Sequence, residues 1–483
     1  MSFPPGKPFA ALLIVAVLTG AFLAFPPSPA RPETGTGTGT GTAAGVGAGA
    51  GVGAGALGAD APGADALVAG DRPLTLWTFA PTHAATFAEI LPRGSVHLVQ
   101  ARALETRLMT LLMADAPPEA LPDLVQLEVN AAARFLRGPP QAVGLLPLEH
   151  RLAAAGLLDA IPAARLGAWT HAGHLYAVPW DLHPVALAYR LDLFEQAGID
   201  LAAPATWEEL HAALRAYRDF RRQRNMPSDA IELNRNAADH VVTLLLQRGH
   251  NLVTADGRVQ IDHPVTLDTL CRLAPLLGGP GDVAAETPSP ASAWVAKLAD
   301  GTVAACLLPD WRLAYLARGA PELAGKVALR PLPIFEAGDA PTSTWGGIGM
   351  AIPADARDPD AAFELLVHLL ASDPGLAARR RHTLVLPPTK EASEAFTMDA
   401  AYWGEDAAGT MRRLARQVPE RAVSVHSPAA AAEVAHVLNR AAAYLDAGHD
   451  PAQLRPKVAK WLISAQKRVE RRAARTAFDE GSP

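Results

Sequence analysis

Two pairs of adjacent tryptophan and aspartate residues have the side chains that a carbohydrate site needs. Trp180 and Asp181 follow a predicted strand, and Asp310 and Trp311 stand at the start of a predicted helix. A pyranose ring has an apolar face and a rim of hydroxyl groups. A site for it therefore combines flat aromatic side chains with side chains that exchange hydrogen bonds in the plane of the ring.

Further candidate residues come near the ends of predicted strands, where α/β sheets place their ligands. Trp345 precedes Gly346 and Gly347, and a glycine has no Cβ to keep a ligand away from the backbone. Core packing is the alternative role for each aromatic candidate, and helix capping is the alternative for Asp181 and for polar residues that precede a helix. The remaining candidates are Glu128, Trp77 and Tyr189, with Asn130 as a weaker one.

Motifs for other kinds of chemistry are weak. Residues 53–58 read GAGALG and match GxGxxG, but no predicted strand precedes them and no predicted helix follows. His171 and His174 lack a further ligand at zinc spacing, and Cys271 and Cys306 stand alone. We therefore expect no metal, no cofactor and two free thiols.

The composition indicates a soluble two-domain body without a nucleic-acid partner. The chain has 483 residues, with 43 Lys and Arg against 49 Asp and Glu, for a net charge of −6. Nucleic-acid-binding proteins need a concentrated positive surface, which this balance does not favour. The hydrophobic content of 49% is enough for real cores once the unusual N-terminus is set aside.

The N-terminus predicts export followed by a flexible tether. Residues 9–25 are almost wholly apolar and follow Lys7, which fits both a cleaved signal segment and a membrane anchor. Residues 31–70 consist mostly of Gly, Ala, Thr, Pro and Val, and such a linker spans roughly 35 Å as a random coil. A linker of this length favours an uncleaved anchor that holds a mobile body.

From residue 73 onward, strand-like runs alternate with helical segments, which predicts an α/β fold with parallel strands. Thr206 and Glu209 have capping-box spacing, so a helix should begin at Trp207. Helices dominate after Pro388. The last helix has an apolar stripe on one face and basic side chains on its other faces, which could contact anionic lipid or a permease. The predicted strands are 74–79, 96–100, 124–127, 184–189, 257–261, 302–308 and 347–352, and other predicted helices are 106–114, 191–197, 241–247, 292–298 and 360–370.

Residues 169–210 resemble the middle of an extracytoplasmic solute-binding protein of carbohydrate ABC transporters, in the maltose-binding-protein-like family 1. They read W-x-x-x-G-x-L-Y-A-V-P-W-D, then LAYRLDLFEQAGID, then P-x-T-W-E-E-L. Residues 122–125, 300–311 and 344–353 resemble further segments of this family. Two features differ: the tether at the N-terminus, and Asp310, which stands where a glycine is more usual.

The resemblance implies an α/β periplasmic binding protein fold, with two discontinuous lobes, a hinge, an interlobe cleft and a helical C-terminal part. We expect the first lobe at 73–182 and 333–395 and the second at 183–332 and 396–475. Residues 1–30 would form the signal or anchor segment, 31–72 the linker and 476–483 a tail.

The resemblance also implies a non-catalytic, monomeric receptor in the periplasm or another extracytoplasmic space. It would bind a sugar or oligosaccharide in the cleft and present it to the permease subunits of an ABC transporter. One alternative is an exported glycoside hydrolase, for which Asp181 and Glu128 would be the two carboxyl groups. The other alternative is a ligand-binding component of a sensory system.

Overall fold

The computed structural model describes residues 73–91, 94–227, 229–254, 256–286 and 292–480. The chain divides into two units, 1–59 and 60–483, and the described residues all belong to the second unit. The predicted signal or anchor segment and the predicted linker lie outside the described residues.

The first sheet combines strands from the two separate stretches of chain that form the first lobe. Its order is β2-β1-β3-β12-β6, with β1 parallel to β2 and β3, as the sequence pattern predicts. Strand β12 arrives much later in the chain and pairs antiparallel with β3 and β6, so the sheet is mixed. The strands are β1 (Thr75–Thr78), β2 (Ser95–Leu98), β3 (Leu124–Glu128), β6 (Val178–Pro179) and β12 (Ile348–Ala351).

The second sheet has β7 as a central strand between two antiparallel neighbours. Its order is β11-β7-β10-β8-β9, and β7 pairs antiparallel with β10 and β11. Residues 257–261 were expected to form a strand, but they contain only an isolated bridge from Val253 to Val259. The strands are β7 (Val185–Arg190), β8 (Ile231–Glu232), β9 (Ala284–Ala285), β10 (Ala305–Pro309) and β11 (Val327–Arg330), and β4 (Thr170–His171) with β5 (His174–Leu175) forms a separate hairpin.

Both faces of the second sheet are covered by helices. Along β7, Val185, Leu187 and Tyr189 pack into one hydrophobic cluster, and the alternate residues Ala186 and Ala188 pack into another. This is the two-residue period of a strand that is buried on both sides. The helices of the second lobe are α6 (Leu191–Gln196), α7 (Trp207–Arg222), α8 (Ala238–Gln247), α9 (Pro264–Leu277), α10 (Ser292–Ala299), α11 (Asp310–Gly319), α14 (Lys390–Glu394), α15 (Ala400–Trp403), α16 (Ala407–Ala415), α17 (Ser427–Asp446) and α18 (Leu454–Glu480).

A third hydrophobic cluster surrounds the first sheet and forms the core of the first lobe. Within the described part of the chain, no single helix is long and apolar enough to cross a membrane, although the bent pair α12 and α13 passes by length and composition. Most of the apolar side chains of α12 are buried in this cluster. The helices of the first lobe are α1 (Pro81–Ile90), α2 (Ala101–Met113), α3 (Val129–Phe135), α4 (Glu149–Ala154), α5 (Ala163–Leu166), α12 (Pro359–Ala371) and α13 (Asp373–His382).

The chain crosses between the lobes at positions that differ from two of the expected boundaries. Phe335 and Trp345 pack in the core of the second lobe, and the first-lobe core resumes only at Ile348. The return to the second lobe comes after Ala378, because Leu386 already packs there. The boundaries expected at 332/333 and 395/396 are therefore wrong. The loop after β11 is held to the second lobe by the ring of Phe335, which stacks on Trp207. Its residues have no helical or strand period, so the sequence gives no sign of this contact.

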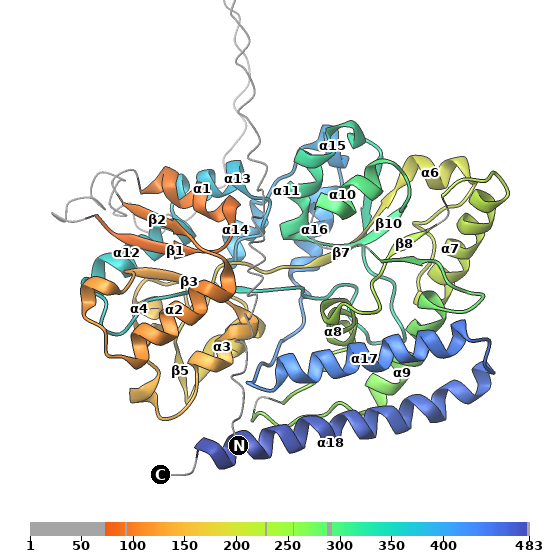
Figure 1. The fold of residues 1–483 in the computed structure, drawn as a ribbon. Helices are drawn as coiled ribbons and strands as arrows, with labels where there is room; N and C mark the ends of the chain where they lie inside the picture. The colour runs from red at the N-terminus through yellow and green to blue at the C-terminus, as the bar shows by residue number, and fades with distance from the viewer. Residues whose placement is uncertain (1–72, 92–93, 228, 255, 287–291, 481–483) are drawn as a thin grey trace, which may run out of the picture. The chain divides into compact units, whose positions relative to one another are not determined.

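Three connecting segments thus join the lobes, and Figure 1 shows them running between the two sheets. The first covers residues 181–184, the second 344–347 and the third 383–388. The first two are paired with each other through a bridge from Pro184 to Thr344. The third lies beside the first, because the Leu182 N–H donates to the Leu386 carbonyl at 3.2 Å.

The capping box predicted at Thr206 is confirmed, and it gives a test of local helix stability. The Thr206 hydroxyl accepts from the Glu209 N–H at 3.2 Å, and the Glu209 carboxylate accepts from the Thr206 N–H at 3.1 Å. Thr206→Ala should lower the free energy of unfolding by about 1 kcal/mol, measured by urea denaturation. Thr106→Ala, in the middle of α2, is the matched control and should have a smaller effect. Equal losses in the two variants would contradict the capping role.

Candidate functional site

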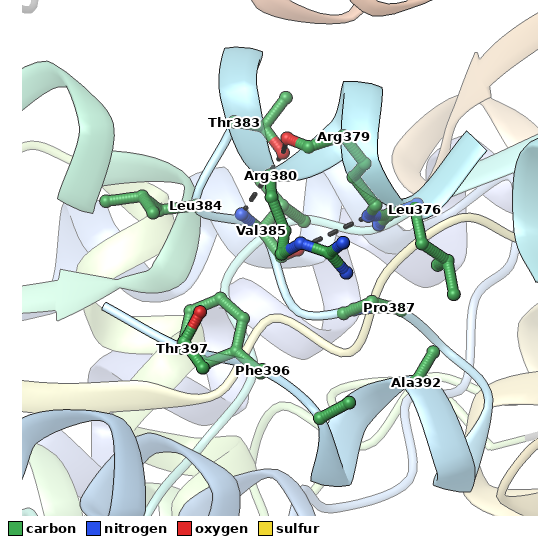
Figure 2. A pocket seen from close by; sticks show the side chains of 11 residues that line it. Leu376, Arg379, Arg380, Thr383, Leu384, Val385, Pro387, Ala392, Phe396 and Thr397 are labelled. Atoms are coloured by element: carbon green, nitrogen blue, oxygen red, sulfur yellow. Dashed lines mark hydrogen bonds between the residues drawn. The ribbon is translucent and has the colours of Figure 1, made fainter. Parts of the chain in front are cut away.

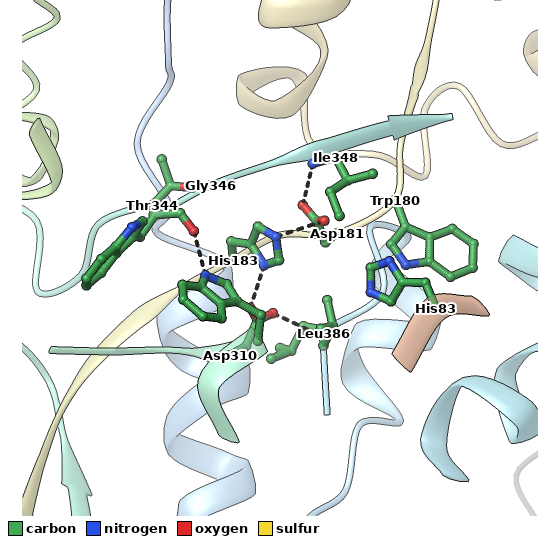
Figure 3. A network of polar contacts seen from close by, with 12 residues as sticks. His83, Trp180, Asp181, His183, Asp310, Thr344, Gly346, Ile348 and Leu386 are labelled. Atoms are coloured by element: carbon green, nitrogen blue, oxygen red, sulfur yellow. Dashed lines mark hydrogen bonds and ion pairs between the residues drawn. The ribbon is translucent and has the colours of Figure 1, made fainter. Parts of the chain in front are cut away.

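A histidine held between two aspartates lies where the connecting segments meet (Figure 3). His183 Nδ1 is 2.5 Å from Asp310 Oδ1, and His183 Nε2 is 2.9 Å from Asp181 Oδ2. All three side chains are buried. His183 and Asp181 belong to the first connecting segment, whereas Asp310 is the first residue of α11 in the second lobe. We call these three residues the hinge triad.

Each aspartate of the hinge triad also holds a neighbouring segment. Asp310 Oδ2 accepts from the Leu386 N–H at 2.8 Å, which fixes the third connecting segment. Asp181 Oδ1 lies 3.4 Å from Arg165 of α5, and Arg165 also donates to the Thr344 hydroxyl at 3.1 Å. The triad therefore ties all three connecting segments to both lobes.

The imidazole of His183 is held in its charged form by this geometry. A neutral imidazole has one N–H donor, whereas both ring nitrogens of His183 face carboxylate oxygens. Burial alone would lower its pKa, but Asp181 and Asp310 outweigh burial and raise the pKa of His183 to about 9. In the other direction, burial opposes ionisation of Asp181, yet His183 and Arg165 keep the pKa of that carboxyl below its usual value.

Trp180 lies next to the hinge triad but is enclosed by the first lobe. Its ring contacts Phe87 and His83, with centroids 5.2 and 5.7 Å away, and the Arg379 guanidinium lies 4.1 Å from the ring. The exposed fraction of Trp180 is 0%. In this conformation the indole has no face available to a ligand.

Arg379 also shapes a small cavity beside the third connecting segment (Figure 2). It donates to the Trp180 carbonyl and, at 3.3 Å, to the Val385 carbonyl. Burial lowers the pKa of Arg379 to about 10, although Asp181 and Asp310 oppose this. The cavity measures about 20 Å³, which is room for one water molecule and not for a sugar. Arg379 therefore supports the hinge from the side of α13.

Two other sequence candidates are core residues in this structure. Trp77 has 3% of its surface exposed, lies in the first-lobe core and is covered by the Arg107 guanidinium at 4.4 Å. Tyr189 is buried in the second lobe with its ring against Phe194 at 6.0 Å. The core alternative thus describes Trp77, Trp180 and Tyr189, because strand ends in this fold are covered by helices as well as by the lobe interface.

Trp311, Trp345 and Gly346 are brought together at the edge of the second lobe. The Trp311 Nε1–H donates to the Trp345 carbonyl at 3.0 Å, and the two rings are perpendicular with centroids 5.9 Å apart. His240 of α8 meets the Trp345 ring edge to face at 4.7 Å. Trp345 is 9% exposed, whereas Trp311 is half-buried.

The backbone conformation at positions 346 and 347 requires glycine. Their φ angles are +94° and +144°, a region that favours glycine, and a Cβ on Gly347 would lie 3.2 Å from an Arg165 guanidinium nitrogen. The Gly347 carbonyl accepts from the Val129 N–H at 2.9 Å. The second connecting segment therefore runs close against the first lobe.

Glu128 and Asn130 belong to a polar group on the opposite side of Gly346. Asn130 donates to Glu128 at 2.6 Å, and Arg421 donates to Asn130 at 2.6 Å and to the Gly346 carbonyl at 3.0 Å. Burial raises the pKa of Glu128, and Arg421 partly offsets this. Helix α3 begins at Val129, so Asn130 lies inside the helix and its alternative role as a helix cap is wrong.

Arg421 and Asn251 were not predicted from the sequence. The Asn251 side chain of the second lobe bonds the Glu420 carbonyl at 3.2 Å and the Ala422 N–H at 2.8 Å, and Val423 packs on the first-lobe core. The segment 418–425 therefore contacts both lobes. Its residues follow neither a helical nor a strand period. In the sequence, only Arg421 distinguishes this segment from an ordinary loop.

The hinge triad predicts a loss of stability in alkali. Because the pKa of His183 in the folded protein is about 9 and its ordinary value is 6.5, its stabilising contribution is complete below pH 6.5 and is lost as the pH rises through about 9. The free energy of unfolding, measured by urea denaturation across this window, should fall. His183→Asn, which tolerates the φ of +50° at this position, should be less stable below pH 6.5 and should lose this decline.

A decline on the acid side serves as the internal control. Burial lowers the pKa values of His83, His240 and His250 to between about 3 and about 4. Their contributions are present above pH 6.5 and are lost as the pH falls towards those values, in the wild type and in His183→Asn alike. A wild-type stability that does not decline between pH 6.5 and 9 would contradict the charged hinge.

Comparisons with known proteins agree with this architecture. The arabinooligosaccharide-binding protein of Halalkalibacterium halodurans is 24% identical over 321 residues, which cover 63% of this chain and 69% of that protein. The arabinooligosaccharide-binding protein of Bacillus subtilis is 22% identical over 331 residues, covering 63% of this chain and 71% of that protein. The sugar-binding protein MalE from Xanthomonas citri superposes with a TM-score of 0.65 at 18% identity, over 85% of this chain and 100% of that structure, which shows a common fold.

The match to a family model covers most of the two-lobe body. It covers residues 96–407, which include both sheets except β1 and the first residue of β2, as well as all three connecting segments and the hinge triad. Helices α17 and α18 follow the matched residues. The chain belongs to the family described as bacterial extracellular solute-binding protein.

Proposed function

We propose that this solute-binding protein captures a sugar or oligosaccharide between its lobes and presents it to the permease of an ABC transporter. The proposal rests on the groups that surround Gly346. Its carbonyl is bonded by Arg421, and a Cβ at this position would lie 3.8 Å from Trp311 Nε1. An aromatic ring and a charged hydrogen-bonding group thus converge on Gly346, which is only partly buried. The names of the two arabinooligosaccharide-binding relatives support the same class of ligand.

In the proposed site, the two lobes supply different chemistry. Trp311 of the second lobe offers aromatic surface for the apolar face of a sugar ring, and the Trp345 carbonyl holds its indole N–H in place. Glu128 accepts hydrogen bonds from hydroxyl groups, and Arg421 donates hydrogen bonds to them. Closure around the ligand then requires only that the closed lobes contact the sugar better than the open lobes do. Gly346, which is only partly buried, completes this set because it has no side chain to keep a ligand from the backbone.

The structure does not favour the glycoside hydrolase alternative. That mechanism needs two carboxyl groups that face each other across a bound glycosidic bond. Asp181 is fully buried and is paired with His183 and Arg165, so it cannot face a ligand in this conformation. The members of the family are binding proteins and not enzymes, which agrees with a receptor that leaves its ligand unchanged.

The location is extracytoplasmic, as the family description implies. We propose in addition that residues 9–25 remain as a membrane anchor and that the protein is monomeric. Edman or mass-spectrometric sequencing of the N-terminus of the mature protein should find residues 9–25 still present. A mature chain that begins at Arg31 would contradict the anchor.

The sugar site is tested by isothermal titration against a panel of mono- and oligosaccharides. Trp311→Ala should weaken binding of the best ligand by on the order of 30-fold, the effect typical of a buried aromatic anchor. Unfolding in urea should show that the variant remains folded, because part of the Trp311 side chain is exposed and its removal leaves little cavity.

Trp461→Ala is the matched control for this substitution. Trp461 is also half-buried, but it lies on α18 with the Arg440 guanidinium 4.2 Å from its ring, away from Gly346. Its loss should leave the sugar affinity unchanged. If Trp311→Ala binds as tightly as the wild type, or if no sugar of the panel binds, the proposed site or the proposed ligand class is wrong.

A further inference from the structure

Helix α18 has opposite chemistry on its two sides. Leu454, Val458, Leu462 and Val469 are buried in the second-lobe core, where α18 packs on α17 and α9 (Figure 1). Residues 454–474 nevertheless contain seven Lys and Arg against one Glu, in a chain with a net charge of −6. Positive charge is therefore concentrated on the outer face of this helix.

Three of these cations form a continuous exposed line. Lys460, Lys467 and Arg471 are spaced by seven and four residues, which places them on one face of the helix. All three are exposed, and within the described part of the chain no carboxylate lies at ion-pair distance from any of them. We call these three residues the cationic ridge. Ile463, which is 45% exposed, lies beside it.

A groove between α17 and α18 adjoins the cationic ridge. It has a volume of about 400 Å³, and its polar lining is mostly basic. Glu433 is bound there by Arg468 through two contacts of 3.0 and 2.6 Å, so the acid of the groove is neutralised. The other polar side chains that line the groove are His436, Arg440 and Arg472.

We propose that the cationic ridge and this groove dock the protein on the anionic headgroups of a lipid bilayer. The ridge extends for about 16 Å along the helix axis, long enough to meet several headgroups. Lysines carry their charge on flexible stems, which suits a fluid surface better than a fixed partner. Ile463 can enter the interface, as apolar side chains of surface-bound helices do.

This proposal rests on the extracytoplasmic location of the protein and is independent of the sugar. A receptor that serves a membrane permease works at the bilayer surface, where positive charge on one face would orient it. The permease itself could instead offer acidic side chains to the cationic ridge. The experiment below separates these two kinds of partner.

The test measures how fast an acylating reagent modifies each lysine of the full-length protein, read by mass spectrometry. Vesicles of phosphatidylglycerol and phosphatidylcholine should slow the modification of Lys460 and Lys467 by on the order of tenfold, and vesicles of phosphatidylcholine alone should not. Lys326, an exposed lysine elsewhere on the second lobe, should react at the same rate in both. Salt at about 1 M, where the Debye length is about 3 Å, should abolish the protection.

The triple variant Lys460→Gln, Lys467→Gln, Arg471→Gln tests the surface itself, with the protection of Lys457 as its readout. The matched control carries Arg215→Gln, Lys326→Gln and Arg380→Gln, which change the net charge equally at exposed positions elsewhere. Protection of Lys457 should disappear in the first variant and persist in the second. Both variants should keep the sugar affinity of the wild type, which separates this proposal from the proposed function.

Three outcomes would overturn the proposal. Equal protection on both kinds of vesicle would mean that charge does not direct the contact. Equal protection by inorganic phosphate in solution would assign the surface to a free anion. Protection that appears only when the permease is present in vesicles of phosphatidylcholine would assign the surface to an acidic protein partner.

Discussion

The imidazolium of His183 between Asp181 and Asp310 is the interaction on which the two-lobe arrangement depends. Charges are costly to bury, and removal of one partner from a buried pair leaves the other uncompensated. Here Asp310 also holds the third connecting segment, and Asp181 also holds the Arg165 side chain. Loss of the charge on His183 would therefore weaken the contacts of every segment that joins the lobes.

The proposed binding site is arranged around the same junction. Gly346 lies between the hinge triad and the polar group of Glu128, Asn130 and Arg421, and its carbonyl accepts from Arg421. Because Trp311 follows Asp310 directly, the ring that we propose for ligand contact and the carboxylate that holds the hinge start the same helix. A ligand that moves Trp311 would act on the hinge through one peptide bond.

Much of this architecture is visible in the sequence, because it arises from local patterns. The capping box at Thr206, the strand at 124–127 and the helix at 360–370 follow from the spacing of a few residues, and the fold class follows from the resemblance of residues 169–210 to a known family. The lobe boundaries were misplaced because residues 331–346 pack through isolated rings such as Phe335 without any period.

The site was harder to predict for a related reason. Adjacent Trp180 and Asp181 fit a sugar site by residue type, but their roles depend on Arg379, Arg165 and His183, which are brought together only by the fold. Arg421 lies nearly 300 residues from Asn130, and no local pattern connects them. Residue chemistry in the sequence suggested a class of ligand, whereas the burial of Trp77 and Trp180 is decided only by the fold.

The order of strands in the first sheet has a consequence for synthesis of the chain. Strand β3 ends at Glu128, but its neighbour β12 begins only at Ile348, after most of the second lobe has been made. A growing chain therefore leaves one edge of β3 without its partner while some two hundred further residues leave the ribosome. Unpaired strand edges are prone to wrong association, so secretion before folding, or protection by a chaperone, would suit this topology.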